Sequence, residues 1–188
     1  MEAFFVSTAL VAVAEIGDKT QLLALMLAAR YRKPWPIVLG ILCATLANHG
    51  LAAWIGAAVA AWIGTDAMRW ILGGTFIVMA GWCLIPDKAD DGPQAARQAG
   101  AFFATLIAFF IVEIGDKTQI ATVALAARFN SLVAVTAGTT VGMMLANVPV
   151  VLFGDAIARR LPLRIVRGVA AALFVALGLA ALLFPSAP

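Results

Sequence analysis

Charged residues are scarce in this sequence. They make up 12% of its 188 positions, whereas hydrophobic residues make up 63%. An ordinary soluble domain carries about 25% charged residues. Because so little charge cannot cover a water-exposed surface, the composition argues against a soluble domain and predicts an all-α protein embedded in a lipid bilayer.

Histidine and cysteine are nearly absent as well. His49 is the single histidine, and the two cysteines, Cys43 and Cys83, lack the spacing of metal ligands. We interpret both cysteines as packing residues and His49 as a structural histidine, with a proton relay as its alternative role.

Motifs of energy-coupled or catalytic proteins are also lacking. The sequence has no GxxxxGK[ST] motif, which argues against direct use of ATP by this chain. It has no recognisable nucleophile or enzymatic metal motif either, so we expect no enzymatic activity and no cofactor.

Long apolar runs are what the sequence does have. A membrane-spanning helix needs about 20 mostly apolar residues. The first run lacks the basic start of a cleavable signal peptide, so it is retained as a span. The six expected spans are residues 3–28, 36–63, 69–85, 101–127, 132–153 and 165–184.

Basic residues are distributed unevenly between the two ends of these spans. Arg69 and Arg128 lie on the side of the termini, and nine basic residues lie on the other side. Since positive charge favours the cytoplasmic side, we expect the termini outside and the central linker in the cytoplasm. The pI near 9.2 then indicates anionic lipid rather than nucleic acid as the partner. The nine residues are Arg30, Arg32, Lys33, Lys88, Arg97, Arg159, Arg160, Arg164 and Arg167.

The chain is an internal repeat. Residues 15–21 and residues 113–119 both read EIGDKTQ, and a shift of 98 positions also aligns Gly40 with Gly138. Three spans per copy would make the second copy enter the membrane from the opposite side, as in the inverted repeats of many transporters. We therefore predict six transmembrane helices in two inverted three-helix repeats. The expected parts are residues 1–85, a linker at 86–100, and residues 101–188.

The repeated motif carries the chemistry. In a continuous helix, Glu15, Asp18 and Lys19 would share one face, and their counterparts in the second copy would do the same. Charged side chains in a membrane interior are costly and usually functional. Four carboxylates meeting there offer hard oxygen ligands to Mn²⁺, Ca²⁺ or Mg²⁺. The structural alternative is two buried ion pairs that only lock the halves together, which desolvation disfavours.

Two lysines, Lys19 and Lys117, complicate an all-acid cage. With four carboxylates they leave a net charge of −2, which one divalent cation would balance. We expect the lysines to act as internal counter-ions, although they could instead extend to the membrane interface.

Neutral polar residues extend the candidate site. Gln21 and Gln119 follow the aspartates by three positions, whereas Thr20 and Thr118 would point elsewhere unless the preceding glycine unwound the helix.

Two asparagines lie midway along the second and fifth spans. Pro149 frees the carbonyl of Leu145 beside Asn147, and such carbonyls complete cation sites in transporters. An interhelical amide bond is the alternative role for Asn48 and Asn147.

The candidate metal site therefore combines carboxylates with amides, and lysines and threonines support it. The ligands are Glu15, Asp18, Gln21, Asn48, Glu113, Asp116, Gln119 and Asn147, and the supporting residues are Lys19, Thr20, Lys117 and Thr118.

The doubled motif, one copy per three-span half, resembles the Golgi and bacterial manganese and calcium transporter family of the lysine-exporter-like superfamily. That family shows two Glu-x-Gly-Asp-(Lys/Arg)-(Ser/Thr) motifs in six or seven spans. The resemblance implies that Glu15, Asp18, Glu113 and Asp116 bind the cation. It also implies Mn²⁺ export in a bacterial inner membrane with proton or cation counterflow, with Ca²⁺ transport as the common variation.

The expected function is thus a secondary transporter that exports Mn²⁺, and Ca²⁺ as a second candidate, by alternating access in exchange for protons. Proton coupling fits because burial disfavours an ionised carboxylate and a bound metal favours it. The alternative is an exporter of amino acids or other small organic solutes, in which Lys19 and Lys117 would bind a substrate carboxylate. A channel is a further alternative.

Overall fold

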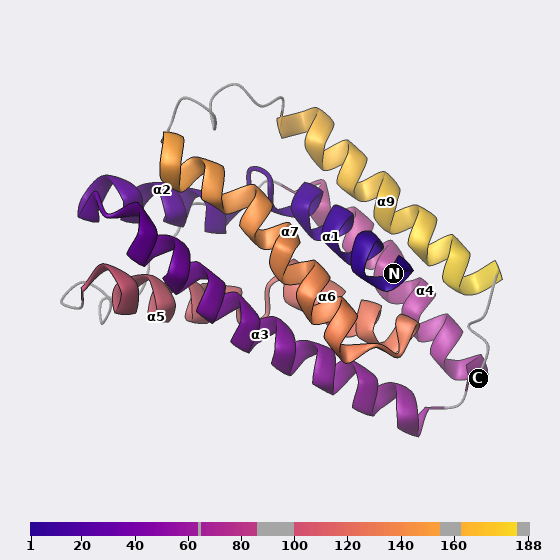
Figure 1. Cartoon of the computed structure of the whole chain (residues 1–188). Helices are drawn as coiled ribbons and strands as arrows, with labels where there is room; N and C mark the ends of the chain where they lie inside the picture. Colours follow the sequence, from indigo (N-terminus) through magenta and orange to yellow (C-terminus); the bar gives the residue numbers. More distant parts are fainter. Residues whose placement is uncertain (64, 86–99, 155–162, 184–188) are drawn as a thin grey trace.

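The computed structural model of the chain describes residues 1–63, 65–85, 100–154 and 163–183. All regular structure within these ranges is helical (Figure 1). The helices are α1 (Glu2–Glu15), α2 (Lys19–Tyr31), α3 (Pro34–Trp62), α4 (Thr65–Cys83), α5 (Ala101–Glu113), α6 (Lys117–Phe129), α7 (Leu132–Phe153) and α9 (Leu163–Leu183).

Four helices cover four of the expected apolar runs. α3, α4, α7 and α9 coincide to within a few residues with the ranges 36–63, 69–85, 132–153 and 165–184. Three stretches are long and apolar enough to cross a membrane, namely Pro34–Trp62, Leu132–Phe153 and Arg164–Leu183. The described part of the chain is therefore all-helical, and three of its helices have the length and composition of membrane spans. The predicted linker, apart from Gly100, lies outside the described residues.

The expectation of continuous helices over residues 3–28 and 101–127 was wrong. α1 ends at Glu15 and α2 begins at Lys19, and α5 and α6 are interrupted in the same way between Glu113 and Lys117. The acids and lysine of one motif therefore do not share a helix face. Each of these two apolar runs instead forms two short helices, with a break at the motif.

A tight turn at the motif glycine causes the first break. Ile16 has φ −65° and ψ 115°, Gly17 has φ +80°, and the Asp18 amide donates to the Glu15 carbonyl over 3.0 Å. These values describe a type II β-turn, which needs a positive φ at its third residue and so favours glycine.

The second break repeats this geometry. Ile114 has φ −63° and ψ 120°, Gly115 has φ +75°, and the Asp116 amide donates to the Glu113 carbonyl over 3.1 Å. The same seven letters thus fold into the same turn twice.

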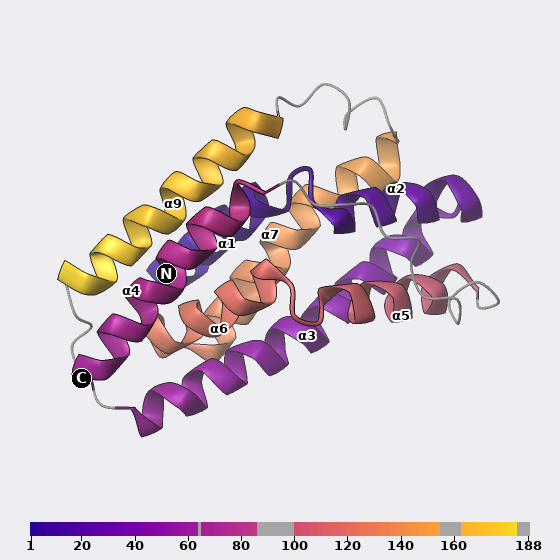
Figure 2. The same ribbon diagram turned by 180° about the vertical axis from the view of Figure 1, so that it is seen from behind.

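The helices pack as a bundle in which α4 and α9 lie side by side along one flank and α3 runs along the opposite flank (Figures 1 and 2). The rings of Phe76 and Phe174 face each other between α4 and α9, with centroids 6.3 Å apart. Gly73 leaves room there for Leu182, whose Cγ would lie 2.5 Å from an added Cβ. Small residues therefore bring this pair of helices close together.

Two further glycines set equivalent helix crossings in the centre. A Cβ on Gly40 of α3 would lie 2.8 Å from the Phe102 carbonyl oxygen of α5. A Cβ on Gly138 of α7 would lie 2.5 Å from the Phe4 carbonyl oxygen of α1. Gly40 and Gly138 are 98 positions apart, and so are Phe4 and Phe102. α3 against α5 and α7 against α1 are therefore matching contacts in the two halves.

Candidate metal centre

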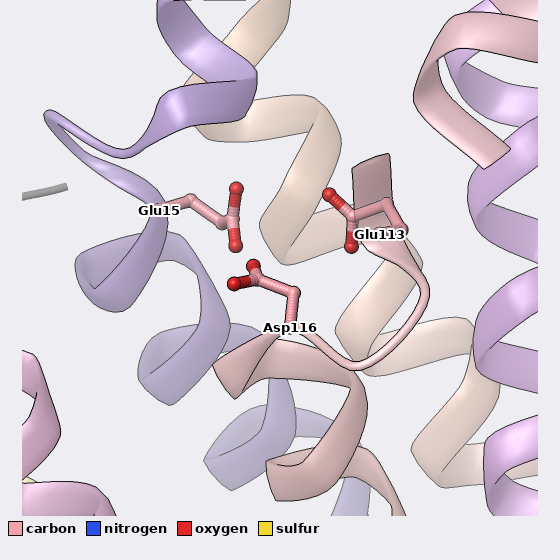
Figure 3. Close-up of side chains that lie close together, drawn as sticks. All are labelled: Glu15, Glu113 and Asp116. Carbon is pink, nitrogen blue, oxygen red and sulfur yellow. The ribbon is translucent and has the colours of Figure 1, made fainter. Parts of the chain in front are cut away.

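The two helix breaks face each other inside the bundle. Glu15 is the last residue of α1, Glu113 is the last residue of α5, and Asp116 directly precedes α6. Figure 3 shows the carboxylates of these three residues pointing toward one another across the gap between the breaks. Each break thus ends one helix and starts another with its acids directed inward.

Three carboxylates form the centre of the site. One oxygen each from Glu15, Glu113 and Asp116 lies within 4.8 Å of the others, and all three residues are buried. Two ligands of one metal ion at about 2.2 Å are separated by about 3 to 4.5 Å. A small contraction would therefore let all three bind one ion.

Asp18 is not part of this group of three. Its Oδ1 atom lies 2.5 Å from Lys117 Nζ, whereas Lys19 Nζ lies 3.2 Å from Asp116 Oδ1. Each lysine therefore pairs with the aspartate of the other motif. The sequence predicted four converging acids, and the structure brings together three and holds the fourth in an ion pair.

The net charge of the group suits one divalent cation. Glu15, Glu113 and Asp116 with the lysine beside them, Lys19, sum formally to −2, while the other ion pair is neutral. Among the described residues, no hydrogen-bond donor reaches Glu15 Oε1 or Glu113 Oε1. Buried oxygens that lack a donor favour a cation as their partner.

The threonines of the motif lie beside the acids. Thr20 Oγ1 donates to Glu15 Oε2 over 2.5 Å, and Thr118 Oγ1 lies 3.4 Å from both Glu113 Oε2 and Asp116 Oδ2. The unwinding at the glycine brings them there, as considered in the sequence analysis. They orient the two glutamate carboxylates by donating to Oε2 of each, and no donor among the described residues reaches Oε1.

The glutamines hold the turns in place. Gln21 Oε1 accepts from the Gly17 amide over 2.9 Å, and Gln119 Oε1 accepts from the Gly115 amide over 2.7 Å. Because each side-chain oxygen already accepts a hydrogen bond from the break, these residues buttress the site in this structure. Their amide nitrogens reach the neighbouring helices instead.

The asparagines differ from each other. Asn48 Oδ1 accepts from Gln119 Nε2 over 3.1 Å, and Asn48 Nδ2 donates to the Phe110 carbonyl over 2.9 Å. Asn147 Nδ2 donates to the Met143 carbonyl over 3.1 Å, and no donor among the described residues reaches its buried Oδ1. Asn48 therefore serves as an interhelical bridge, and Asn147 Oδ1 remains open to a ligand.

Hydrogen bonds of the glutamines define the structural register of the repeat. Gln119 Nε2 donates to the side chain of Asn48 over 3.1 Å, and Gln21 Nε2 donates to the carbonyl of Ala146 over 3.0 Å. These partners are 98 positions apart. The structural counterpart of His49 is accordingly Asn147, whereas a one-residue adjustment that matches Asn48 with Asn147 would pair it with Val148.

His49 is a site neighbour that the sequence analysis did not select. Its Nε2 atom lies 3.7 Å from Glu113 Oε2, and the side chain is completely buried. The signal available in the sequence was its position one residue after Asn48. The missing information was the register that turns this face of α3 toward α5.

The sequence is similar to those of known proteins over most of its length. A Vibrio cholerae protein named "Putative manganese exporter" is 54% identical over 185 residues, which cover 98% of this chain and 92% of that protein. A Synechocystis protein, GDT1-like protein sll0615, is 28% identical over 86% of this chain and 87% of its own length. GDT1-like protein 4 of rice (Oryza sativa subsp. indica) is 27% identical over 98% of this chain and 74% of its own length.

No solved structure matches the chain. The model of the family described as "Divalent cation/proton antiporter GDT1" matches residues 3–91 and 101–187. These segments span both motifs and nearly all of the helices described above. The chain therefore belongs to the GDT1 family of divalent cation/proton antiporters.

Proposed function

We propose that this protein exports Mn²⁺ from the cytoplasm in exchange for protons. The observation that carries the proposal is the group of three buried carboxylates, Glu15, Glu113 and Asp116, drawn from both copies of the motif. Carboxylate oxygens suit Mn²⁺ and Ca²⁺. Mn²⁺ is preferred because the Vibrio cholerae relative is named a manganese exporter, and Ca²⁺ is the second candidate.

Six spans in two inverted repeats are the proposed membrane arrangement. α1 with α2 would form one broken span, and α5 with α6 would form its counterpart. Support comes from the identical turns at Gly17 and Gly115 and from the matching helix crossings at Gly40 and Gly138. Broken helices at the centre of inverted repeats are common in secondary transporters.

The unequal positions of the two aspartates suggest how access alternates. Asp116 lies with the two glutamates, whereas Asp18 is drawn toward Lys117. In an inverted repeat, exchanging the conformations of the halves yields the opposite-facing state. Asp18 would then join Glu15 and Glu113 while Asp116 moved toward Lys19. The cation would be passed from one aspartate to the other across the membrane.

Protons complete the cycle. When the cation leaves, the group of carboxylates has too much negative charge for a buried site. Protons taken from outside would restore neutrality and would be released when the next cation binds. The carboxylates thus bind either metal or protons, which couples the two fluxes.

Both lysines are engaged with aspartates, which favours the counter-ion role. Lys19 lies 3.2 Å from Asp116, and Lys117 lies 2.5 Å from Asp18. A substrate carboxylate would have to displace these partners. The geometry therefore disfavours the amino-acid exporter considered above.

Placement in a bacterial inner membrane with the termini outside is also proposed. The orientation rests on the excess of basic residues expected on the cytoplasmic side, and the bacterial inner membrane rests on the similarity to the Vibrio cholerae protein. Part of that excess, including Lys88, Arg97, Arg159 and Arg160, lies outside the described residues.

Proteoliposomes test the proposal. Purified protein should carry out saturable Mn²⁺ transport driven by an imposed pH gradient, and Glu15→Gln and Asp116→Asn should abolish it. Glu2→Gln, a change of the same type at the exposed start of α1, should leave transport intact. Folded wild-type protein that carries no Mn²⁺ under a pH gradient would contradict the proposal, as would a non-saturating flux.

A further inference from the structure

His49 has no role in the site as described so far. It is the single histidine of the chain and is completely buried. Among the described residues, no hydrogen-bond partner reaches either ring nitrogen. A buried imidazole that lacks a partner is costly, so a ligand for it is expected.

The imidazole ring of His49 lies beside the group of three carboxylates. His49 Nε2 lies 3.7 Å from Glu113 Oε2, on the side of α3 that faces α5. Two ligands about 2.2 Å from one ion lie about 3 to 4.5 Å apart. The nitrogen and the Glu113 oxygen are therefore at a separation that two ligands of one cation can have.

The corresponding position in the other half strengthens this assignment. Asn147, 98 residues after His49, is also buried, and its Oδ1 atom has no donor among the described residues. Equivalent places in the two halves thus offer one nitrogen and one oxygen. The acids and the turns are the same in both halves, whereas His49 and Asn147 differ in the atom that they offer to a metal.

We propose that His49 is a nitrogen ligand that makes the site select Mn²⁺, and other first-row transition-metal cations, over Ca²⁺ and Mg²⁺. The proposal rests on the proposed function, since it concerns the same cation site. Ca²⁺ and Mg²⁺ take oxygen ligands almost exclusively, whereas transition-metal cations accept imidazole as well. One nitrogen among carboxylates therefore disfavours Ca²⁺ and Mg²⁺ relative to Mn²⁺.

Electron spin echo spectroscopy of Mn²⁺ bound to the purified full-length protein tests the ligand directly. Wild type should show modulation from a directly coordinated ¹⁴N nucleus, and His49→Gln, which offers an amide oxygen, should lose it. A purely structural histidine would produce no such modulation. Bound Mn²⁺ without ¹⁴N modulation in wild type would overturn the proposal even if the variant failed to fold.

Transport selectivity gives the second measurement. His49→Gln should lower the ratio of Mn²⁺ to Ca²⁺ apparent affinities by about 10-fold or more, mainly through weaker Mn²⁺ binding. Thr45→Val, one turn earlier on α3 and equally buried, is the matched control and should keep the wild-type ratio. An unchanged ratio in folded His49→Gln would overturn the selectivity role. Absence of Mn²⁺ binding to wild type would instead overturn the proposed function, and this inference with it.

Discussion

Lys117 Nζ lies 2.5 Å from Asp18 Oδ1, so the lysine of the second motif neutralises the aspartate of the first. Lys19 and Asp116 make the reciprocal pair at 3.2 Å. Each copy of the motif is therefore incomplete without the other. The two halves share their charges, and a change in one half reaches the acids of the other directly.

Breaking one of these pairs should cost more than removing it entirely. Lys117→Met removes the ammonium group that lies 2.5 Å from the buried Asp18 and should destabilise the protein by roughly 3–5 kcal/mol, whereas the double variant Asp18→Asn with Lys117→Met should lose less. Thermal unfolding in detergent measures this. Asp66→Asn, in a pair whose aspartate is 94% exposed, is the control and should unfold like wild type. Additive losses in the double variant would contradict the pairing.

The motif glycines should not tolerate a side chain. Gly115 has φ +75°, and nothing lies within 4 Å of an added Cβ, so the cost of Gly115→Ala comes from the backbone alone. We expect a loss of roughly 1–2 kcal/mol and weaker Mn²⁺ binding, since the turn positions Glu113 and Asp116. Gly81→Ala in α4, equally open but with no positive φ, should cost nothing. Equal stability of the two variants would argue against the turn.

The crossing of α7 over α1 should be equally sensitive. A Cβ on Gly138 would lie 2.5 Å from the Phe4 carbonyl oxygen. Gly138→Ala should therefore push α1, which carries Glu15, away from the site and destabilise the protein by roughly 1–3 kcal/mol. Unfolding and Mn²⁺ titrations measure both effects. Gly168→Ala in α9, which meets no atom within 4 Å, should behave like wild type.

Mn²⁺ binding should strengthen as the pH rises. The metal needs ionised carboxylates, so protons compete with it, and lowering the pH should weaken the apparent affinity. The expected change is about 10-fold per pH unit for each proton displaced. Calorimetric titrations in buffers of different ionisation enthalpy give the number of protons released. That number should be at least one in wild type. Affinity independent of pH would contradict the exchange of metal for protons.

The helices that lack the motif could be predicted from apolar run length alone, as α3 and α7 show. The breaks in the other two spans could not, because hydrophobicity continues through Ile16 and Ile114. The available signal was local. A glycine between an extended isoleucine and an aspartate suits a type II turn, but composition cannot decide whether a membrane helix continues through it.

The site was predictable in its residue types and less so in its arrangement. A repeat of charged residues in apolar runs identified Glu15, Glu113 and Asp116 as ligand candidates. The pairing of Asp18 with Lys117 depends on how the two halves pack against each other, and the sequence pattern does not reveal this packing. The proximity of His49 depends on the register of α3 against α5, which is set by backbone contacts such as that at Gly40.

The central claim is that both motifs build one shared cation site. The most direct test is the stoichiometry of Mn²⁺ binding to the purified protein, measured by calorimetry for wild type, Glu15→Gln and Glu113→Gln. We predict one Mn²⁺ per chain in wild type and loss of that ion in either variant. Two ions in wild type, with one remaining after each change, would show that each motif binds its own ion and would contradict the account.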